Sequence, residues 1–275
     1  MRAPNPIGTP ITLERRQLWI RQFAAYRHTV DMASISAWLE QFKNDDRDVA
    51  ARVLDAVDFV SLERVSAFYR TGLRSLQGWH VDPTLRQGRW RFCPWSTSAG
   101  ESGDSMLHNF RVANGLATRP NKDLFIHPSD ILKAGLGADD SLVFVNDFIG
   151  TGTEVCDAWN EMFAELTVGI GSVYLLVALT HREGRARVCA DTDVQVVSGQ
   201  ELTDGDNLFD AACAHFSAEE KAAILEYACL ADKKRPKGFG ELGLVVVFQH
   251  RCPNNSIAIL HAQSKRWTPL FPRHD

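Results

Sequence analysis

The sequence predicts an α/β fold in which a mainly parallel central sheet is flanked by helices and preceded by an N-terminal helical layer. Two observations favour this class. Strongly apolar segments of strand length occur at residues 141–147, 173–179 and 242–248. Segments in which apolar residues recur at helical spacing separate them. Because the strands of a parallel sheet are buried on both faces and are connected by helices, this alternation indicates parallel strands.

The helical layer is expected within residues 1–84. Residues 1–10 contain three prolines and should form a disordered or wrapping arm. From Thr12 to Leu76 apolar residues recur every three or four positions, and neither glycine nor proline occurs between Ile11 and Thr71. This pattern predicts three or four helices that pack on an α/β domain at residues 85–275.

The remaining elements of the α/β domain follow from shorter patterns. Apolar or alternating residues predict further strands at 90–95, 187–189, 194–197 and 257–260. Helices are expected at 104–116, 153–166 and 217–230. The last of these begins with a Ser-x-x-Glu capping box at Ser217 and Glu220.

Charge and composition exclude some classes of protein. The net charge of −4 rules out a globally basic nucleic-acid coat. Residues 233–275 nevertheless contain eight Lys or Arg against two acidic residues, a local charge of +6. This asymmetry indicates either a local anionic partner or a solvated basic tail. The six cysteines are scattered, with no CxxC pair and no histidine at zinc-site spacing, so we expect reduced thiols and no metal site made by protein alone.

The sequence also sets an expectation for the compartment. No apolar run approaches the roughly 20 residues that a membrane helix needs. The first ten residues lack the apolar core of a signal peptide. We therefore expect a cytoplasmic protein without a membrane partner.

The segment Leu142–Thr153 carries the clearest chemical signal. Its apolar strand ends in Asn146 and Asp147, at the sheet edge where open α/β folds bind ligands. A turn of Gly150, Thr151, Gly152 and Thr153 follows and opens directly into a helix. Glycines let the backbone N–H groups approach a ligand, threonines add hydroxyl donors, and the helix N-terminus favours an anion. The segment is suited to a phosphate, with Asp147 directed at whatever carries that phosphate.

Other interpretations of this segment are weaker. The alternative without a ligand is an ordinary strand–turn–helix in which Asp and Thr only cap the helix. A Walker loop is excluded because no Gly-Lys-Ser/Thr occurs, and the dinucleotide-binding GxGxxG pattern is absent as well.

The segment resembles the PRPP-binding motif of type I phosphoribosyltransferases, an apolar strand with two acidic residues followed by a Thr/Gly loop. The resemblance implies that Asp147 contacts the ribose hydroxyls of PRPP and that Gly150 to Thr153 hold the 5-phosphate. Asn146 occupies the position of the first acid, which is a departure from the family. Because Asn carries no charge, the resemblance supports binding more strongly than catalysis, although both Asp147 and Asn146 are candidate catalytic residues.

The C-terminal region adds a more specific resemblance. Residues 250–256, His-Arg-Cys-Pro-Asn-Asn-Ser, and 267–273, Trp-Thr-Pro-Leu-Phe-Pro-Arg, are similar to elements of divergent phosphoribosyltransferase-like proteins of the PRTase-CE type. These occur in bacterial conflict and phage-defence loci, including retron-associated and toxin–antitoxin-like ones. The resemblance implies a phosphoribosyltransferase-like fold and an effector that transfers phosphoribosyl groups or cleaves nucleotides. The alternative is a non-catalytic PRPP-fold sensor or a subunit of a nucleoprotein complex.

Two further groups complete the expected site. The resemblance places a pyrophosphate loop after the first strand of the domain, at Ser98, Gly100, Ser102 and Gly103, although a solvated surface loop is equally compatible with these residues. It also implies Mg²⁺ bound through the diphosphate of the substrate. The candidate residues for an acceptor pocket are His250, Asn254 and Asn255, where Asn-Asn is also an ordinary turn pair.

Overall fold

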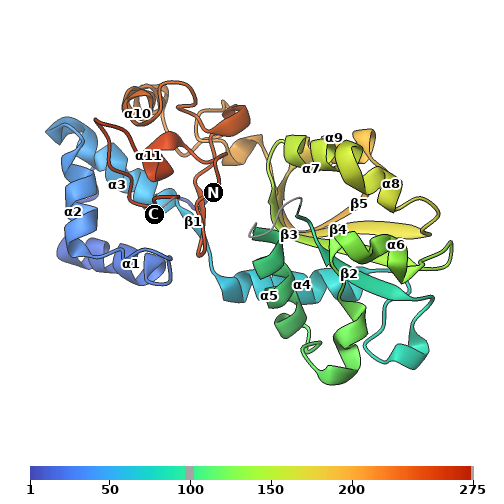
Figure 1. Cartoon of the computed structure of the whole chain (residues 1–275). Coiled ribbons are helices and arrows are strands. Elements are labelled where there is room, and N and C mark those ends of the chain that lie inside the picture. Colours follow the sequence, from blue (N-terminus) through green and yellow to red (C-terminus); the bar gives the residue numbers. More distant parts are fainter. Residues whose placement is uncertain (97–101, 274–275) are drawn as a thin grey trace. The chain divides into compact units, whose positions relative to one another are not determined.

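A computed structural model describes residues 1–96 and 102–273 of the chain (Figure 1). The predicted class is confirmed, because the fold is α/β with parallel strands flanked by helices. The chain forms two compact units. Unit 1 combines Met1–Leu62 with Thr203–Asp275, and unit 2 comprises Glu63–Leu202. This division differs from the expected boundary after residue 84, because the first helices share a core with the C-terminal segment.

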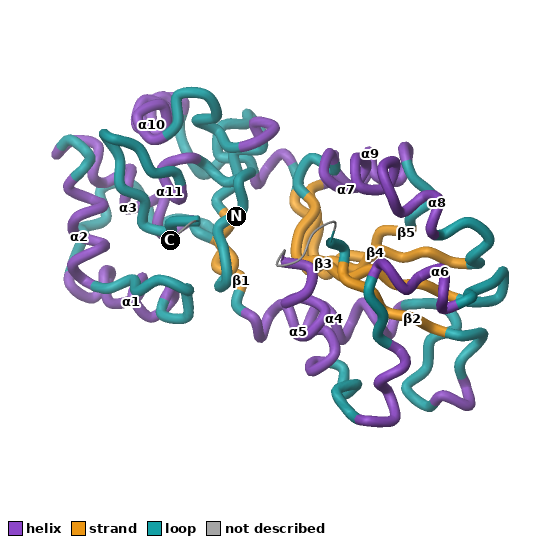
Figure 2. Tube along the Cα trace, viewed as in Figure 1, coloured by secondary structure: helices purple, strands orange, loops and turns teal. Residues whose placement is uncertain are grey.

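Unit 2 is built on a four-stranded sheet, drawn in orange in Figure 2. The strand order is β2-β3-β4-β5, and every neighbouring pair is parallel. The strands are β2 (Trp90–Pro94), β3 (Ser141–Ile149), β4 (Ser172–His181) and β5 (Gln195–Leu202). The helices are α4 (Leu62–Ser75), α5 (Ser102–Ala113), α6 (Ile131–Ala134), α7 (Thr153–Ala158), α8 (Ala164–Leu166) and α9 (Arg182–Asp191). A π-helical turn, Trp159–Phe163, joins α7 to α8, so residues 153–166 form one continuous helical segment.

The two faces of this sheet are covered by different helices. Phe144 of β3 packs in one core with Phe163, whose ring centroid lies 4.6 Å away. On α4, a Cβ added at Gly72 would lie 3.0 Å from Leu176 of β4. A Cβ added at Gly199 of β5 would lie 2.2 Å from Phe68 of the same helix. The small residues therefore set how closely α4 approaches the sheet.

Unit 1 is mainly helical. It contains α1 (Leu13–Phe23), α2 (Met32–Glu40), α3 (Arg47–Ala56), α10 (Ala218–Ala231) and α11 (Ala258–His261). A two-stranded parallel sheet pairs β1 (Asp58–Val60) with β6 (Val246–Phe248). Trp38 of α2 and Trp267 of the C-terminal segment are both buried, with ring centroids 6.3 Å apart. Segments from both ends of the chain thus form one core.

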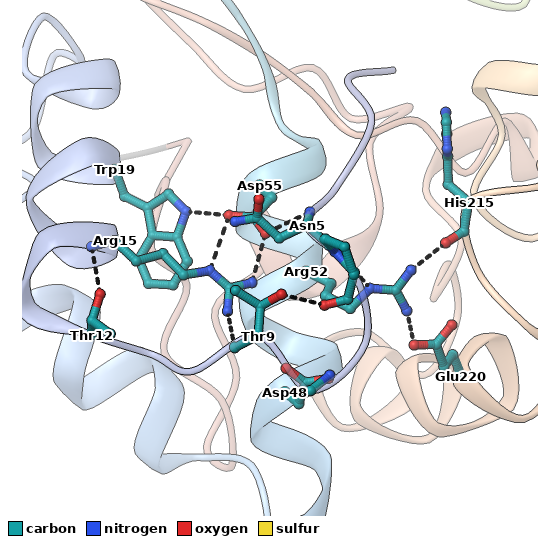
Figure 3. Close-up of polar contacts among 12 residues, drawn as sticks. Asn5, Thr9, Thr12, Arg15, Trp19, Asp48, Arg52, Asp55, His215 and Glu220 are labelled. Atoms are coloured by element: carbon teal, nitrogen blue, oxygen red, sulfur yellow. Dashed lines mark hydrogen bonds and ion pairs between the residues drawn. The ribbon is translucent and has the colours of Figure 1, made fainter.

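The proline-rich N-terminus wraps along unit 1 rather than extending freely (Figure 3). Arg15 of α1 donates to the backbone carbonyl of Thr9 at 2.6 Å and forms a buried ion pair with Asp55 of α3 at 2.6 Å. Arg52, also on α3, donates to the carbonyl of Asn5 at 3.0 Å and pairs with Glu220 of α10. The arm is held because the buried guanidinium groups use its carbonyls as acceptors.

Three of the predicted strands need correction. Residues 187–189 belong to helix α9, in which Gly184 and Val188 are buried one helical turn apart. Residues 258–260 belong to helix α11, and Ile257 is its N-cap. The strand prediction was wrong because a short, fully buried apolar run is compatible with either element. The segment 242–248 contributes only the three residues of β6 to the sheet. No helix of the described residues is long and apolar enough to span a bilayer.

Candidate functional site

Strand β3 carries Asn146 and Asp147 near its carboxyl end. Asn146 is buried, and its side-chain oxygen accepts the backbone N–H of Asp147 at 2.9 Å. The carbonyl of Asn146 accepts the hydroxyl of Tyr69, from α4, at 2.8 Å. Burial, and then the nearby charge of Asp147, raise the pKa of Tyr69 well above its ordinary value. The phenol therefore stays protonated and fixes the strand at the position of the polar pair.

The turn after β3 is packed too closely for side chains. Gly152 is the N-cap of α7 and has a φ of 77°, in the left-handed region. A Cβ at this position would lie 2.7 Å from the carbonyl oxygen of Gly184 in α9. A Cβ at Gly184 would in turn lie 2.0 Å from the carbonyl oxygen of Gly150. The backbone of the turn thus lies directly on the first turn of α9.

A chain of hydroxyl groups runs across the turn. Arg187 of α9 donates from Nη1 to Oγ1 of Thr153 at 2.7 Å. Oγ1 of Thr153 lies 3.0 Å from Oγ1 of Thr151. Because a guanidinium can only donate, Thr153 accepts a hydrogen bond from Arg187, and its own hydroxyl can donate a hydrogen bond to Thr151. The hydroxyl of Thr151 is then left to donate to a ligand.

The backbone of the turn offers further donors. Within residues 1–96 and 102–273, the N–H groups of Thr151 and Gly152 have no hydrogen-bond acceptor. The carbonyl of Gly152 accepts from Cys156 at 2.9 Å and so starts the helical segment that extends to residue 166. Donors at a helix start, a hydroxyl and a nearby guanidinium together suit an anion such as a phosphate.

The expected pyrophosphate loop is only partly visible. Ser98 and Gly100 lie outside the described residues. Ser102 is the first residue of α5, and Gly103 follows it. A Cβ at Gly103 would lie 2.4 Å from the carbonyl oxygen of Trp95, so this glycine allows α5 to start close to the end of β2.

The expected acceptor-pocket residues belong to unit 1, whereas the phosphate turn belongs to unit 2. The side chain of buried Asn255 donates to the carbonyl of Phe239 at 2.9 Å, and the carbonyl of Asn254 accepts the Phe239 N–H at 2.7 Å. These two residues support the turn at Phe239. The ring of His250 lies 5.5 Å from that of Phe248.

Sequence reasoning missed three residues that shape the phosphate turn. Arg187 was expected to begin a strand at residues 187–189, no element was predicted at Gly184, and Tyr69 lies in a helix without a motif. The four-residue spacing of Gly184 and Val188 fits a helix, but two residues are too few to indicate α9 from the sequence. Among the described residues, no group of three or more His, Cys, Asp or Glu side chains is arranged to hold a metal ion.

A parallel sheet with a polar pair near the end of β3 and a Gly/Thr turn after it is consistent with a phosphoribosyltransferase-like fold. The sequence matches the PRTase-CE family over residues 35–273, most of its length. The chain therefore belongs to the PRTase-CE family, as the resemblance implied. No curated protein matches the sequence.

Proposed function

We propose that the protein binds PRPP or a related nucleotide at the turn Gly150–Thr153. The observation that carries the proposal is a group of hydrogen-bond donors on this turn that are available to a ligand. They are the N–H groups of Thr151 and Gly152 and the hydroxyl of Thr151. Family membership supports a phosphorylated substrate. The 5-phosphate would occupy the turn, and Asp147 would accept hydrogen bonds from the ribose hydroxyls.

Arg187 supplies the charge that the motif itself lacks. The turn contains neither lysine nor arginine, so the helix start alone would have to balance the phosphate. The guanidinium donates from Nη1 to Thr153, and its Nε lies 3.5 Å from Oδ2 of Asp191, an exposed ion pair on α9. The side chain of Arg187 is 43% exposed, which leaves it accessible to a ligand. A charge-assisted hydrogen bond to a phosphate is stronger than a neutral one.

The proposed reaction takes place at the anomeric carbon of the ribose. The bond from this carbon to the diphosphate oxygen breaks, pyrophosphate leaves with the electron pair, and a nucleophile forms the new bond. A carboxylate beside the ring stabilises the positive charge that develops. Asp147 is the one carboxylate of the motif, and it fits Mg²⁺, which prefers one or two carboxylates plus substrate phosphates. Bound Mg²⁺ would neutralise charge on the diphosphate.

A specific observation favours a second candidate, a non-catalytic sensor. The side chain of Asn146 is neutral and buried, and it already accepts the N–H of Asp147. The position that holds an acid in active type I enzymes therefore contributes no charge here. For either candidate we propose an effector role in a phage-defence system of the retron or toxin–antitoxin type, based on the resemblance of the C-terminal elements.

Calorimetric titration with PRPP and Mg²⁺ tests the binding step, and ribose serves as the ligand without phosphates. We expect saturable binding of PRPP and none of ribose. Pyrophosphate release, measured with a panel of nucleobases and with water alone, then separates enzyme from sensor. Absence of PRPP and nucleotide binding would refute the proposal.

A further inference from the structure

A groove of about 520 Å³ lies in unit 1. None of the residues that line it belongs to the phosphate turn, which is part of unit 2. One wall consists of residues 229–234, at the end of α10 and just beyond it. The other wall consists of residues 262–266, which follow α11. We refer to it as the basic groove.

The basic groove is strongly cationic. Lys233 and Lys234 are exposed on one wall, and Lys265 and Arg266 are exposed on the other. Within the part of the chain that the structure describes, none of these four side chains forms an ion pair. Asp232 is the one carboxylate among the lining residues, and its Oδ1 accepts the backbone N–H groups of Lys234 and Arg235 at 2.8 and 3.2 Å. Its hydrogen bonds are therefore made to backbone rather than to the cations.

The walls are fixed relative to each other. The hydroxyl of Ser264 on one wall donates to the carbonyl of Leu230 on the other at 2.8 Å. The N–H of Ser264 donates to the carbonyl of Trp267 at 3.0 Å, and the Trp267 indole donates to Ile259 at 3.0 Å. Trp267 is 2% exposed, so the second wall is anchored in the core of unit 1. The cations are held on a preformed surface.

We infer that the basic groove binds the phosphate backbone of a nucleic acid. Unpaired cations on both walls suit a linear polyanion that runs between them. None of the large exposed hydrophobic side chains of the described residues lines the groove, so it offers no anchor for a lipid chain or an amphipathic peptide. It has no aromatic lining residue on which bases could stack, which makes the recognition independent of base sequence.

The test measures binding of a fluorescein-labelled 20-base-pair DNA duplex to the full chain by fluorescence anisotropy. The groove variant changes Lys233, Lys234, Lys265 and Arg266 to Gln. A matched control removes the same charge from the exposed side chains of Arg21, Lys43, Arg119 and Lys122, which line no part of the groove. We expect the groove variant to bind at least tenfold more weakly than the control.

Salt dependence provides a second readout. If four phosphates are neutralised, a fourfold rise in salt should weaken binding by the wild type about 100-fold, and the groove variant should lose most of this dependence. A variant with Lys233, Lys234 and Lys265 changed to Arg should retain the wild-type affinity, which separates loss of charge from loss of folding. Equal weakening by the groove variant and the control would overturn the inference. So would binding of polyglutamate or anionic vesicles without binding of the duplex, or no binding of any of them.

Discussion

Gly152 shows how closely conformation and packing are coupled at the phosphate turn. We expect Gly152→Ala to destabilise the protein by about 1–3 kcal/mol, because Ala is strained at a φ of 77°. The new methyl group would also meet the carbonyl of Gly184 at 2.7 Å, so PRPP binding should be lost. Urea unfolding and calorimetric titration measure the two effects.

Gly169→Ala is the matched control, since its φ is 81° but no atom lies within 4 Å of the added Cβ. It should show the backbone strain alone and leave binding unchanged. Equal binding by both variants would show that the turn does not hold the ligand.

Asp147 and its neighbour Asn146 separate binding from turnover. Asp147→Asn removes the one carboxylate of the motif, and we expect it to abolish nucleotide binding. Asn146→Asp adds a charge beside the ribose, which should preserve or raise any rate of pyrophosphate release by stabilising developing positive charge. Pyrophosphate release and PRPP titration of the wild type and both variants decide between these outcomes. If Asp147→Asn bound and reacted like the wild type, the enzyme interpretation would fail.

Arg187 is expected to determine selectivity for phosphorylated ligands. Arg187→Gln removes the charge beside Thr153, so PRPP affinity should fall at least tenfold, while Arg187→Lys should restore part of it. Arg185→Gln is the control, because Arg185 lies on the same helix and, like Arg187, pairs with a carboxylate, but its hydrogen bond goes to Glu201 rather than to Thr153. Titration with PRPP, AMP and adenosine measures the selectivity. An unchanged ratio between AMP and adenosine in Arg187→Gln would exclude this role.

At the scale of elements, sequence patterns were sufficient where they were long or carried a cap. In β3 a continuous apolar run, residues 142–145, is followed by the polar pair Asn146 and Asp147. The capping box at Ser217 and Glu220 marks the start of α10 as predicted. Helix α9 was missed because it buries only Gly184 and Val188, too few for a clear periodicity. Because α9 was not predicted, the role of Arg187 was not predicted either. The phosphate turn could be identified from the sequence, but the helix that packs on it could not.

The junction before β3 gives the protein a predicted sensitivity to acid. The Asp140 carboxylate accepts hydrogen bonds from the backbone N–H and from the guanidinium of Arg89, each at 2.7 Å. It also accepts the backbone N–H of Gly137 at 2.8 Å. Burial alone would raise the pKa of Asp140, but these bonds outweigh it and lower the pKa to about 2. The unfolded carboxyl titrates near 3.9. The stabilisation is therefore complete above about pH 4 and is lost as the pH falls towards 2.

We expect Asp140→Asn to cost about 1–2 kcal/mol at pH 7, a value reduced because Arg89 is half exposed, and to flatten the acid limb of the stability curve. Urea unfolding between pH 2 and 7 measures both. Asp139→Asn, at an exposed neighbouring position, is the control and should leave the curve unchanged.

At the scale of the whole molecule, the grouping of chain segments into units is the feature that the sequence could predict least. A boundary after residue 84 follows from a change of composition, whereas the actual grouping depends on contacts between the two ends of the chain. Trp38 and Phe42 of the N-terminal part pack around Trp267, with ring centroids of Phe42 and Trp267 5.1 Å apart. The sequence does not indicate which of these distant residues pack together, because each apolar side chain would fit any buried position.

This shared core leads to a prediction about truncation. A chain that lacks residues 1–62 loses Trp38 and Phe42, two of the ring partners of Trp267, and it also loses β1, the parallel partner of β6. A buried aromatic that loses its neighbours forfeits several kcal/mol, so we expect residues 203–275 to lose their hydrogen-exchange protection. Strands β3 and β4 lie wholly in unit 2 and should stay protected, which provides an internal control in the same sample. Hydrogen exchange followed by mass spectrometry of the intact and truncated chains makes the comparison. Full protection of residues 246–260 in the truncated chain would show that the C-terminal segment folds without the N-terminal helices, and that the two segments are not one cooperative unit.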